Sequence, residues 1–314
     1  MKLIAPDYYE KFKCIADKCR HNCCIGWEID IDEDTYEYYC SLGGKLGDKL
    51  KKNISVGESG ACFVLDEAER CPFLCDNGLC ELITALGEGA LCQICADHPR
   101  FRTYLSDRTE IGLGLCCEAA ARLILTNENK VALKTLSDGG ETAALEPFEA
   151  ECLAQREHIF DLLQNRNVPI EKRVEALLSE YNAELTEIDG ESLFKLYFSL
   201  ERLDARWDER LCLLKNSGRS CQGEFSRFDK AFEQLLVYFI YRHFLDAALD
   251  GKERECVRFA AASYKVIRSI CEENSIKNGV LSLEDIIDTA RAYSSETEYS
   301  EENMELLFET FRNI

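Results

Sequence analysis

The residues of this chain best suited to chemistry are its cysteines, of which thirteen of 18 lie at or before Cys117. Most of these fall into four short groups. The groups are Cys14, Cys19, Cys23 and Cys24; Cys71, Cys75 and Cys80; Cys92 and Cys95; and Cys116 and Cys117. Thiolates at short spacing can close on one metal without a long loop, and their softness suits zinc or iron–sulfur clusters. The sequence therefore predicts a cysteine-ligated metal centre within its first 117 residues.

The spacing of the cysteines favours an iron–sulfur cluster over zinc. Only Cys92 and Cys95 show the two-residue separation that is habitual in zinc sites, whereas iron–sulfur clusters accept irregular spacing. In the adjacent pairs Cys23-Cys24 and Cys116-Cys117, we expect one member to be a ligand and the other to pack beside the site. A zinc knot that only supports folding is the alternative.

The remaining cysteines are isolated within segments of helical periodicity. Free cysteine in such a setting usually acts as a small buried hydrophobe. We assign no chemical role to Cys152, Cys212, Cys221, Cys256 and Cys271.

The formal net charge of −21 limits the partners of the chain. Phosphate binding needs a basic face, so a nucleic-acid partner is excluded, and an anionic membrane surface is disfavoured. A cationic substrate such as a lysine side chain is compatible with this charge, although the charge can also serve solubility alone.

The location of the protein is predicted from its apolar segments. No run of about 18 apolar residues is present, so no transmembrane helix and no membrane insertion are expected. The N-terminal segment MKLIAPDYYEKFKC lacks the apolar core and cleavage site of a signal peptide. These features predict a cytoplasmic protein, in which cysteines serve metal or redox chemistry rather than disulfides.

The pattern of the chain predicts a mainly α protein of two domains. Residues 1–136 form an irregular cysteine-rich metal-binding N-terminal domain, residues 137–142 a linker containing Gly139-Gly140, and residues 143–314 an all-helical C-terminal domain. Apolar residues recur at helical spacing in the later region. The predicted helical blocks are about 146–165, 171–185, 191–214, 225–250, 252–273 and 282–294, with a weaker one near the end.

Local structure near the first cysteines is also predicted. The alternation from Trp27 to Asp32 indicates a short strand, and Asp32 or Asp34 is expected to cap a following helix. A further helix is predicted from Cys116 to Leu125, entered through Gly112-Leu113-Gly114.

Four segments carry a resemblance to a known family. They are KCIADKCRHNCCIGWEIDID, RCPFLCDNGLCELI, LCQICADHPRF and TEIGLGLCCEAAARLI. Together they closely resemble the flagellin lysine-N-methylase family, densely over residues 1–125 and beyond that only in size and helical character. They are also similar to the zinc- or iron-chelating cysteine-cluster proteins.

The resemblance implies an activity and a cofactor. The activity is transfer of a methyl group from S-adenosylmethionine to lysine ε-amino groups of flagellin, in a protein carrying an iron–sulfur cluster of the 4Fe–4S type. By motif, the implied ligand positions are Cys14, Cys19, Cys23, Cys24, Cys71, Cys80, Cys92, Cys95, Cys116 and Cys117. Cys62 and Cys75 fall outside the family pattern.

The reaction makes demands on the remaining side chains. A lysine must lose its proton to attack a sulfonium methyl group, so a desolvated pocket or a nearby base is needed. The candidate carboxylates are Glu28, Asp30 and Asp32 on the polar face of the predicted strand, and Glu110, each of which has a solvated strand face or helix surface as its alternative. The aromatic candidates are Tyr36, Tyr38 and Tyr39, and the histidines considered as base or metal ligand are His21 and His98.

The sequence contains no glycine-rich strand–turn–helix of the usual methyltransferase type, so the S-adenosylmethionine site rests on the resemblance alone. Three functional hypotheses follow: a protein lysine methyltransferase, a non-catalytic iron- or zinc-binding module, and a redox protein that uses the same cluster.

Overall fold

The computed structural model describes residues 1–58, 60–140, 143–185, 190–215 and 225–314. The chain divides into two compact units. Lys13–Arg100 form the first, here called the cysteine unit, and Met1–Phe12 together with Phe101–Ile314 form the second, here called the helical unit. The cysteine unit is therefore inserted into the sequence of the helical unit.

This division falls elsewhere than the predicted boundary between residues 136 and 143. Residues 101–136 belong to the helical unit because their strands and their helix pack with its core. The predicted boundary followed the change in cysteine density and periodicity, whereas long-range strand pairing decides the compact units.

The cysteine unit contains a small antiparallel sheet with strand order β2-β4-β3. The strands are β2 (Asp30–Ile31), β3 (Ile54–Gly57) and β4 (Gly60–Phe63). Its short helices are η2 (Ala16–Lys18), α1 (Glu33–Ser41), α2 (Gly44–Lys52), α3 (Glu81–Leu86), η3 (Glu88–Ala90) and α4 (Gln93–Asp97). The strand predicted from Trp27 to Asp32 thus shortens to two residues, because only Asp30 and Ile31 find partners on β4.

The predicted helix cap at Asp32 is confirmed. Asp32 precedes α1, and its carboxylate accepts a hydrogen bond from the Thr35 backbone N–H at 3.0 Å. A side-chain oxygen at this position satisfies one of the amide groups that a helix start leaves unpaired. The other carboxylate oxygen accepts from the Gln93 N–H at 2.7 Å, so one side chain caps α1 and ties it to α4.

The helical unit contains a sheet that joins distant parts of the chain, with strand order β5-β6-β1-β7. Its strands are β1 (Lys2–Pro6), β5 (Arg100–Tyr104), β6 (Arg108–Leu113) and β7 (Leu133–Ser137). β1 runs parallel to β6 and antiparallel to β7. The last residue of β7 is the first of the predicted linker, and no strand follows it in the described residues.

The helices of this unit follow the predicted blocks closely. They are η1 (Tyr9–Lys11), α5 (Glu118–Leu125), α6 (Pro147–Leu163), α7 (Ile170–Glu180), α8 (Gly190–Phe198), α9 (Trp207–Leu214), η4 (Ser226–Phe228), α11 (Asp229–Leu249), α12 (Glu253–Asn278), α13 (Leu283–Thr297) and α14 (Glu301–Arg312). The block predicted at 191–214 is two helices, α8 and α9, rather than one. The mainly helical class and the helical character of the described residues from 143 onward are confirmed.

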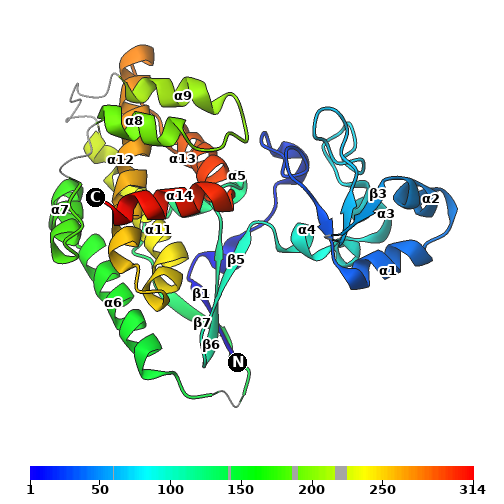
Figure 1. Cartoon of the computed structure of the whole chain (residues 1–314), viewed down its shortest axis with the longest axis horizontal. Helices are drawn as coiled ribbons and strands as arrows, with labels where there is room; N and C mark the ends of the chain where they lie inside the picture. Colours follow the sequence, from blue (N-terminus) through cyan, green and yellow to red (C-terminus); the bar gives the residue numbers. More distant parts are fainter. Residues whose placement is uncertain (59, 141–142, 186–189, 216–224) are drawn as a thin grey trace. The chain divides into compact units, whose positions relative to one another are not determined.

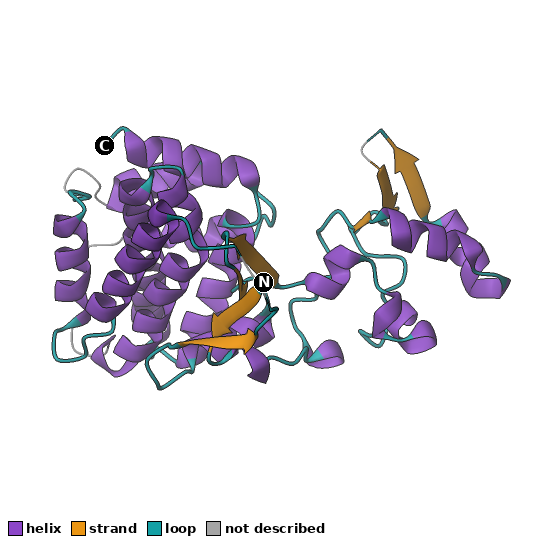
Figure 2. Ribbon diagram, turned by 90° about the horizontal axis from the view of Figure 1, so that it is seen from below, coloured by secondary structure: helices purple, strands orange, loops and turns teal. Residues whose placement is uncertain are grey.

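The core of the helical unit surrounds α11 and α12, which lie side by side (Figure 1). Most residues of α11 are buried on all its faces, as expected of a central helix. α11 also reaches the sheet, because the Tyr241 hydroxyl donates to the Ile111 carbonyl of β6 at 3.0 Å. Figure 2 shows the small sheet beside the layer of helices.

No helix in the described part of the chain has the length and apolar character that a bilayer crossing requires.

Candidate functional site

The cysteine unit brings thiols from three of the four sequence groups to one small core. Cys71 and Cys92 are buried in this core, and Cys24, Cys80 and Cys95 pack against it. We call these five residues the thiol group. They surround apolar side chains that include Tyr39, Phe63 and Phe73.

Backbone hydrogen bonds hold the segments that carry these thiols. The Cys71 N–H donates to the Cys24 carbonyl at 2.8 Å, which ties the first cysteine segment to the second. The Tyr39 hydroxyl donates to the Ala90 carbonyl at 2.7 Å, just before the third segment. Cys92 is the N-cap residue of α4, beside the amide that Asp32 holds. The local fold therefore positions the thiol group through the main chain.

The thiols lie near enough to perturb one another. A hydrogen bond between Cys23 and Cys24 lowers the pKa of Cys23 to about 7 and raises that of Cys24. Burial raises the pKa of Cys71 to about 11. The pKa of Cys95 is raised by a hydrogen bond with Cys92, by burial and by the neighbouring charges of Cys92, Cys24 and Cys71. Several thiolates at such close quarters repel each other unless a cation lies among them.

The donor chemistry of the thiol group fits zinc or an iron–sulfur cluster, since both take thiolate ligands. Within the described ranges, however, no group of three or more His, Cys, Asp or Glu side chains is arranged to hold a metal ion. The structure thus gathers half of the ten cysteines predicted as ligands, and the metal centre stays a prediction.

The other predicted ligands are distributed over both units. Cys14 and Cys23 are exposed and Cys19 is half-buried in the cysteine unit. Cys116 and Cys117 belong to the helical unit, where Cys116 is buried and its pKa is raised by that burial. Of the cysteines that were given no role, Cys152, Cys256 and Cys271 are buried in the helical core as expected.

Two late cysteines need separate comment. Cys212 is exposed, unlike the buried hydrophobe that was predicted, and Cys221 lies outside the described residues.

The predicted catalytic carboxylates are distributed over both units as well. Glu28 and Asp30 are exposed in the cysteine unit, and Asp30 lies on β2. Glu110 lies on β6 of the helical unit and is 3% exposed. The Arg156 guanidinium donates to both of its oxygens, at 2.6 and 2.9 Å, and stacks 5.3 Å from the Tyr241 ring. Glu110 is therefore already neutralised by an internal cation.

The aromatic and histidine candidates also have defined places. Tyr39 is fully buried and Tyr38 is exposed, and their ring centres lie 6.0 Å apart. His98 precedes a cis proline, and burial lowers its pKa to about 4. A histidine with this pKa is neutral at pH 7. His21 is half-buried beside the first cysteine segment.

Gly112, the first of the glycines before Cys116, has a packing role. A Cβ atom added to Gly112 would lie 2.2 Å from the Phe101 ring, so only glycine fits against that ring. Leu115 is held by Tyr238, whose hydroxyl accepts from its N–H at 3.2 Å. The absence of a side chain at Gly112 thus lets β6 pack against the Phe101 ring.

Sequence reasoning missed a network of buried charged residues on α11 and after α13. Glu298 is fully buried, and its carboxylate accepts from the Tyr238 hydroxyl at 2.9 Å and contacts His243 Nε2 at 2.6 Å. The Arg242 Nε lies 3.4 Å from the same carboxylate. We call these four residues the Glu298 network. Nothing in the spacing of single charged residues along helices signals such a network, because Glu298 lies 55 residues after His243 and 60 after Tyr238.

Glu233 on α11 forms a second buried charge cluster. It pairs with Arg166 at 2.8 Å and with Arg173 at 2.6 Å, and it is 1% exposed. Both arginines line a hollow of about 1090 Å³. Both guanidinium groups are thus paired with a buried carboxylate at the edge of this hollow.

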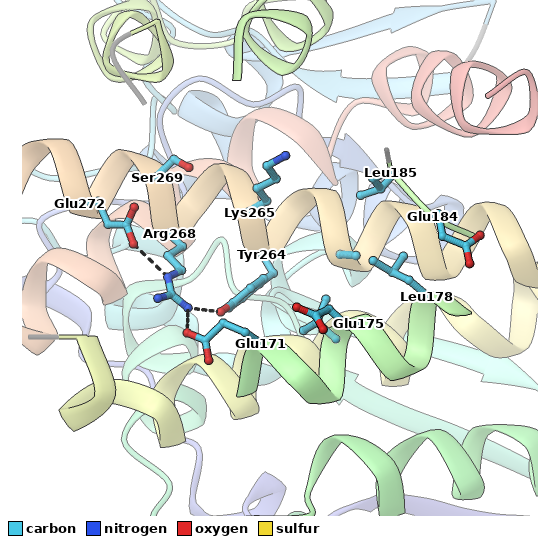
Figure 3. Close-up of a pocket in the computed structure, with 12 residues that line it drawn as sticks. Glu171, Glu175, Leu178, Glu184, Leu185, Tyr264, Lys265, Arg268, Ser269 and Glu272 are labelled. Atoms are coloured by element: carbon cyan, nitrogen blue, oxygen red, sulfur yellow. Dashed lines mark hydrogen bonds and ion pairs between the residues drawn. The ribbon is translucent and has the colours of Figure 1, made fainter. Parts of the chain in front are cut away.

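A second concave surface, of about 640 Å³, lies between α7 and α12 (Figure 3). Its apolar floor is made by Val174, Leu178, Leu185 and Ala261, and its charged lining comprises Glu171, Glu175, Glu184, Glu272, Lys265 and Arg268. We call it the α7–α12 groove. The sequence offered no sign of it beyond the overall negative charge.

Comparison with known proteins finds a family match in the last part of the helical unit. Residues 214–314, from the end of α9 through α14, match the family described as FliB lysine N-methylase C-terminal domain. That segment contains α11, α12, α13 and α14, and with them the Glu298 network.

Parts of the chain are also similar to proteins with assigned names. The Lysine-N-methylase of Salmonella typhimurium is 27% identical over 206 residues, which cover 61% of this chain and 50% of that protein. The Lysine-N-methylase of Salmonella choleraesuis gives the same values. The Flagellar biosynthetic protein FliU of Salmonella muenchen is 26% identical over 134 residues, covering 41% of this chain and 79% of that protein. These matches confirm the resemblance to the flagellin lysine-N-methylase family that the cysteine motifs indicated.

The matched length is limited. The chain spans about half the length of the two lysine-N-methylases it matches. No solved structure matches the chain.

Proposed function

We propose that this protein methylates lysine side chains of flagellin, with S-adenosylmethionine as the methyl donor. The observation that carries the proposal is the match of residues 214–314 to the FliB lysine N-methylase C-terminal domain, supported by relatives named Lysine-N-methylase and FliU. The net charge of −21 is suited to a cationic substrate side chain.

The proposal gives the cysteine unit an iron–sulfur cluster. Its residues Cys24, Cys71, Cys80, Cys92 and Cys95 would supply the thiolate ligands, since they share one core. Such a cluster, when bound, would neutralise the mutual repulsion of those thiolates and fix the small unit around them.

The exposed acidic segment that follows the first cysteines has a proposed part in the reaction. Glu28 and Asp30 would attract the substrate ammonium, while Asp32 is already occupied with capping α1 and α4. Glu28→Lys should then lower the rate constant over affinity by roughly ten- to a hundredfold while leaving the iron content unchanged. Glu58→Lys is the matched control, because Glu58 is also exposed in this unit.

The direct test is co-incubation of the protein, purified without oxygen, with S-adenosylmethionine and flagellin from the same cell. Intact mass spectrometry should show flagellin gaining methyl increments, and omission of S-adenosylmethionine should abolish the gain. Unchanged flagellin mass together with stoichiometric iron or zinc would instead support the non-catalytic metal-binding alternative.

A further inference from the structure

We infer that the α7–α12 groove is a docking site for a lysine-bearing segment of the protein substrate. This inference rests on the proposed function and adds to it the place where the substrate is held. The described residues that line the groove all belong to the helical unit.

The charge of the groove is negative and unevenly distributed. Four glutamates line it against one lysine and one arginine. Arg268 is committed at one end, where it donates to Glu171 at 2.6 Å and to Glu272 at 3.0 Å (Figure 3). The other two lining carboxylates are Glu175, which is paired with the exposed Lys172, and Glu184, which Figure 3 shows at the end opposite to Arg268.

Contacts with Tyr264 help to hold the Arg268 guanidinium in place. It lies 5.8 Å from the Tyr264 ring centre and also donates to the Tyr264 hydroxyl. Burial alone would lower its pKa, but Tyr264 and the two glutamates outweigh that effect and raise it. An anionic ligand would have to displace two glutamates from this guanidinium, so the groove is poorly suited to phosphate or carboxylate.

The floor of the groove suits the rest of a lysine side chain. Val174 and Leu178 of α7 and Ala261 of α12 contribute apolar side chains to its lining. A lysine side chain places its methylene stem on apolar surface while its ammonium stays near carboxylates and water. The groove offers this combination, with an apolar floor and carboxylates at the rim.

An ion pair within the chain shows how a lysine can contact Glu175. Lys172 Nζ lies 2.5 Å from a Glu175 oxygen, and the two side chains are 64% and 61% exposed. An exposed pair of this kind contributes little stability and is easily exchanged. A substrate lysine can therefore replace Lys172 as the partner of Glu175 without disrupting the fold around the groove.

Binding of flagellin to the full-length protein, measured by biolayer interferometry without S-adenosylmethionine, tests the inference. The double variant Glu175→Gln/Glu184→Gln should bind flagellin about three- to tenfold more weakly than the wild type, as expected for two partly exposed ion pairs. The matched control Glu305→Gln/Glu309→Gln removes the same charge from exposed positions of α14 and should bind as the wild type does. Flagellin with acetylated lysines should bind weakly to all forms.

The inference is overturned if the groove variant and the α14 control have the same affinity, if acetylated flagellin binds as well as the unmodified protein, or if the wild type does not bind flagellin. Circular dichroism verifies that each variant is folded. Methyl transfer separates the two proposals. A raised KM with unchanged kcat in the groove variant supports the groove, and an unchanged KM refutes the groove but leaves the activity. Binding without any methylation refutes the activity alone.

Discussion

Replacing Glu298 with glutamine should destabilise the helical unit strongly. The substitution keeps the size of the side chain but removes its negative charge. Arg242, which is 11% exposed, then loses its buried counter-charge, and His243 loses a charged partner at 2.6 Å. The Tyr238 hydroxyl can still donate to the glutamine oxygen, so part of the network persists.

The size of the effect follows from the burial. Removing one partner of a buried ion pair costs about 3–5 kcal/mol, because the remaining charge stays buried and uncompensated. The retained hydrogen bond from Tyr238 places the expected loss near the lower value, about 3 kcal/mol. For a domain of roughly 200 residues, this corresponds to a decrease in Tm of about 6–12 °C.

Thermal unfolding followed by circular dichroism at 222 nm and neutral pH measures this loss. Glu305→Gln, on the exposed face of α14, is the control and should leave the Tm within about 1 °C of the wild-type value. A shift of less than about 2 °C in Glu298→Gln would refute the reasoning, since it would mean that water or another group compensates Arg242.

Further predictions concern metal, packing and pH. Cys71→Ser should remove iron and acid-labile sulfide from protein purified without oxygen, whereas the equally buried control Cys256→Ser should retain both; equal metal loss would place the centre elsewhere. Gly112→Ala should lower the free energy of unfolding by about 1–3 kcal/mol because its methyl group meets the Phe101 ring, and a urea midpoint like that of the wild type would show that the ring yields freely. Burial lowers the pKa of His243 from 6.5, so the folded state binds fewer protons than the unfolded state. The free energy of unfolding should therefore fall as the pH decreases through about 6.5. Constant urea midpoints between about pH 7 and pH 5 would contradict this.

The sequence was a good guide where structure is local. The Asp32 cap follows from a side-chain oxygen placed directly before a helical segment, and α11 and α12 follow from their periodic apolar residues. The pairing of β1 with β6 leaves no comparable sign, because Lys2 and Arg108 are far apart in sequence and the strands are short. The boundary between the units depends on that pairing, and periodicity could not reveal it.

For the candidate sites, too, the sequence revealed what depends on local spacing and missed what depends on contacts between distant segments. Cysteine spacing pointed to the region in which the thiol group assembles, since close spacing in sequence limits distance in space. It could not show that Cys116 and Cys117 belong to the other unit, because membership of a core depends on contacts between distant segments. The role of Glu110 was equally hidden, as its partner Arg156 lies 46 residues further along the chain.

Because the cysteine unit is inserted between β1 and β5, it is synthesised before the sheet of the helical unit is complete. β1 leaves the ribosome before the cysteine unit, whereas its parallel partner β6 begins only at Arg108. At about 5–20 residues per second, β1 waits roughly 5–20 s for that partner. Lys13–Arg100 emerge completely during this interval. The thiol group can therefore assemble on the nascent chain before the sheet of the helical unit closes.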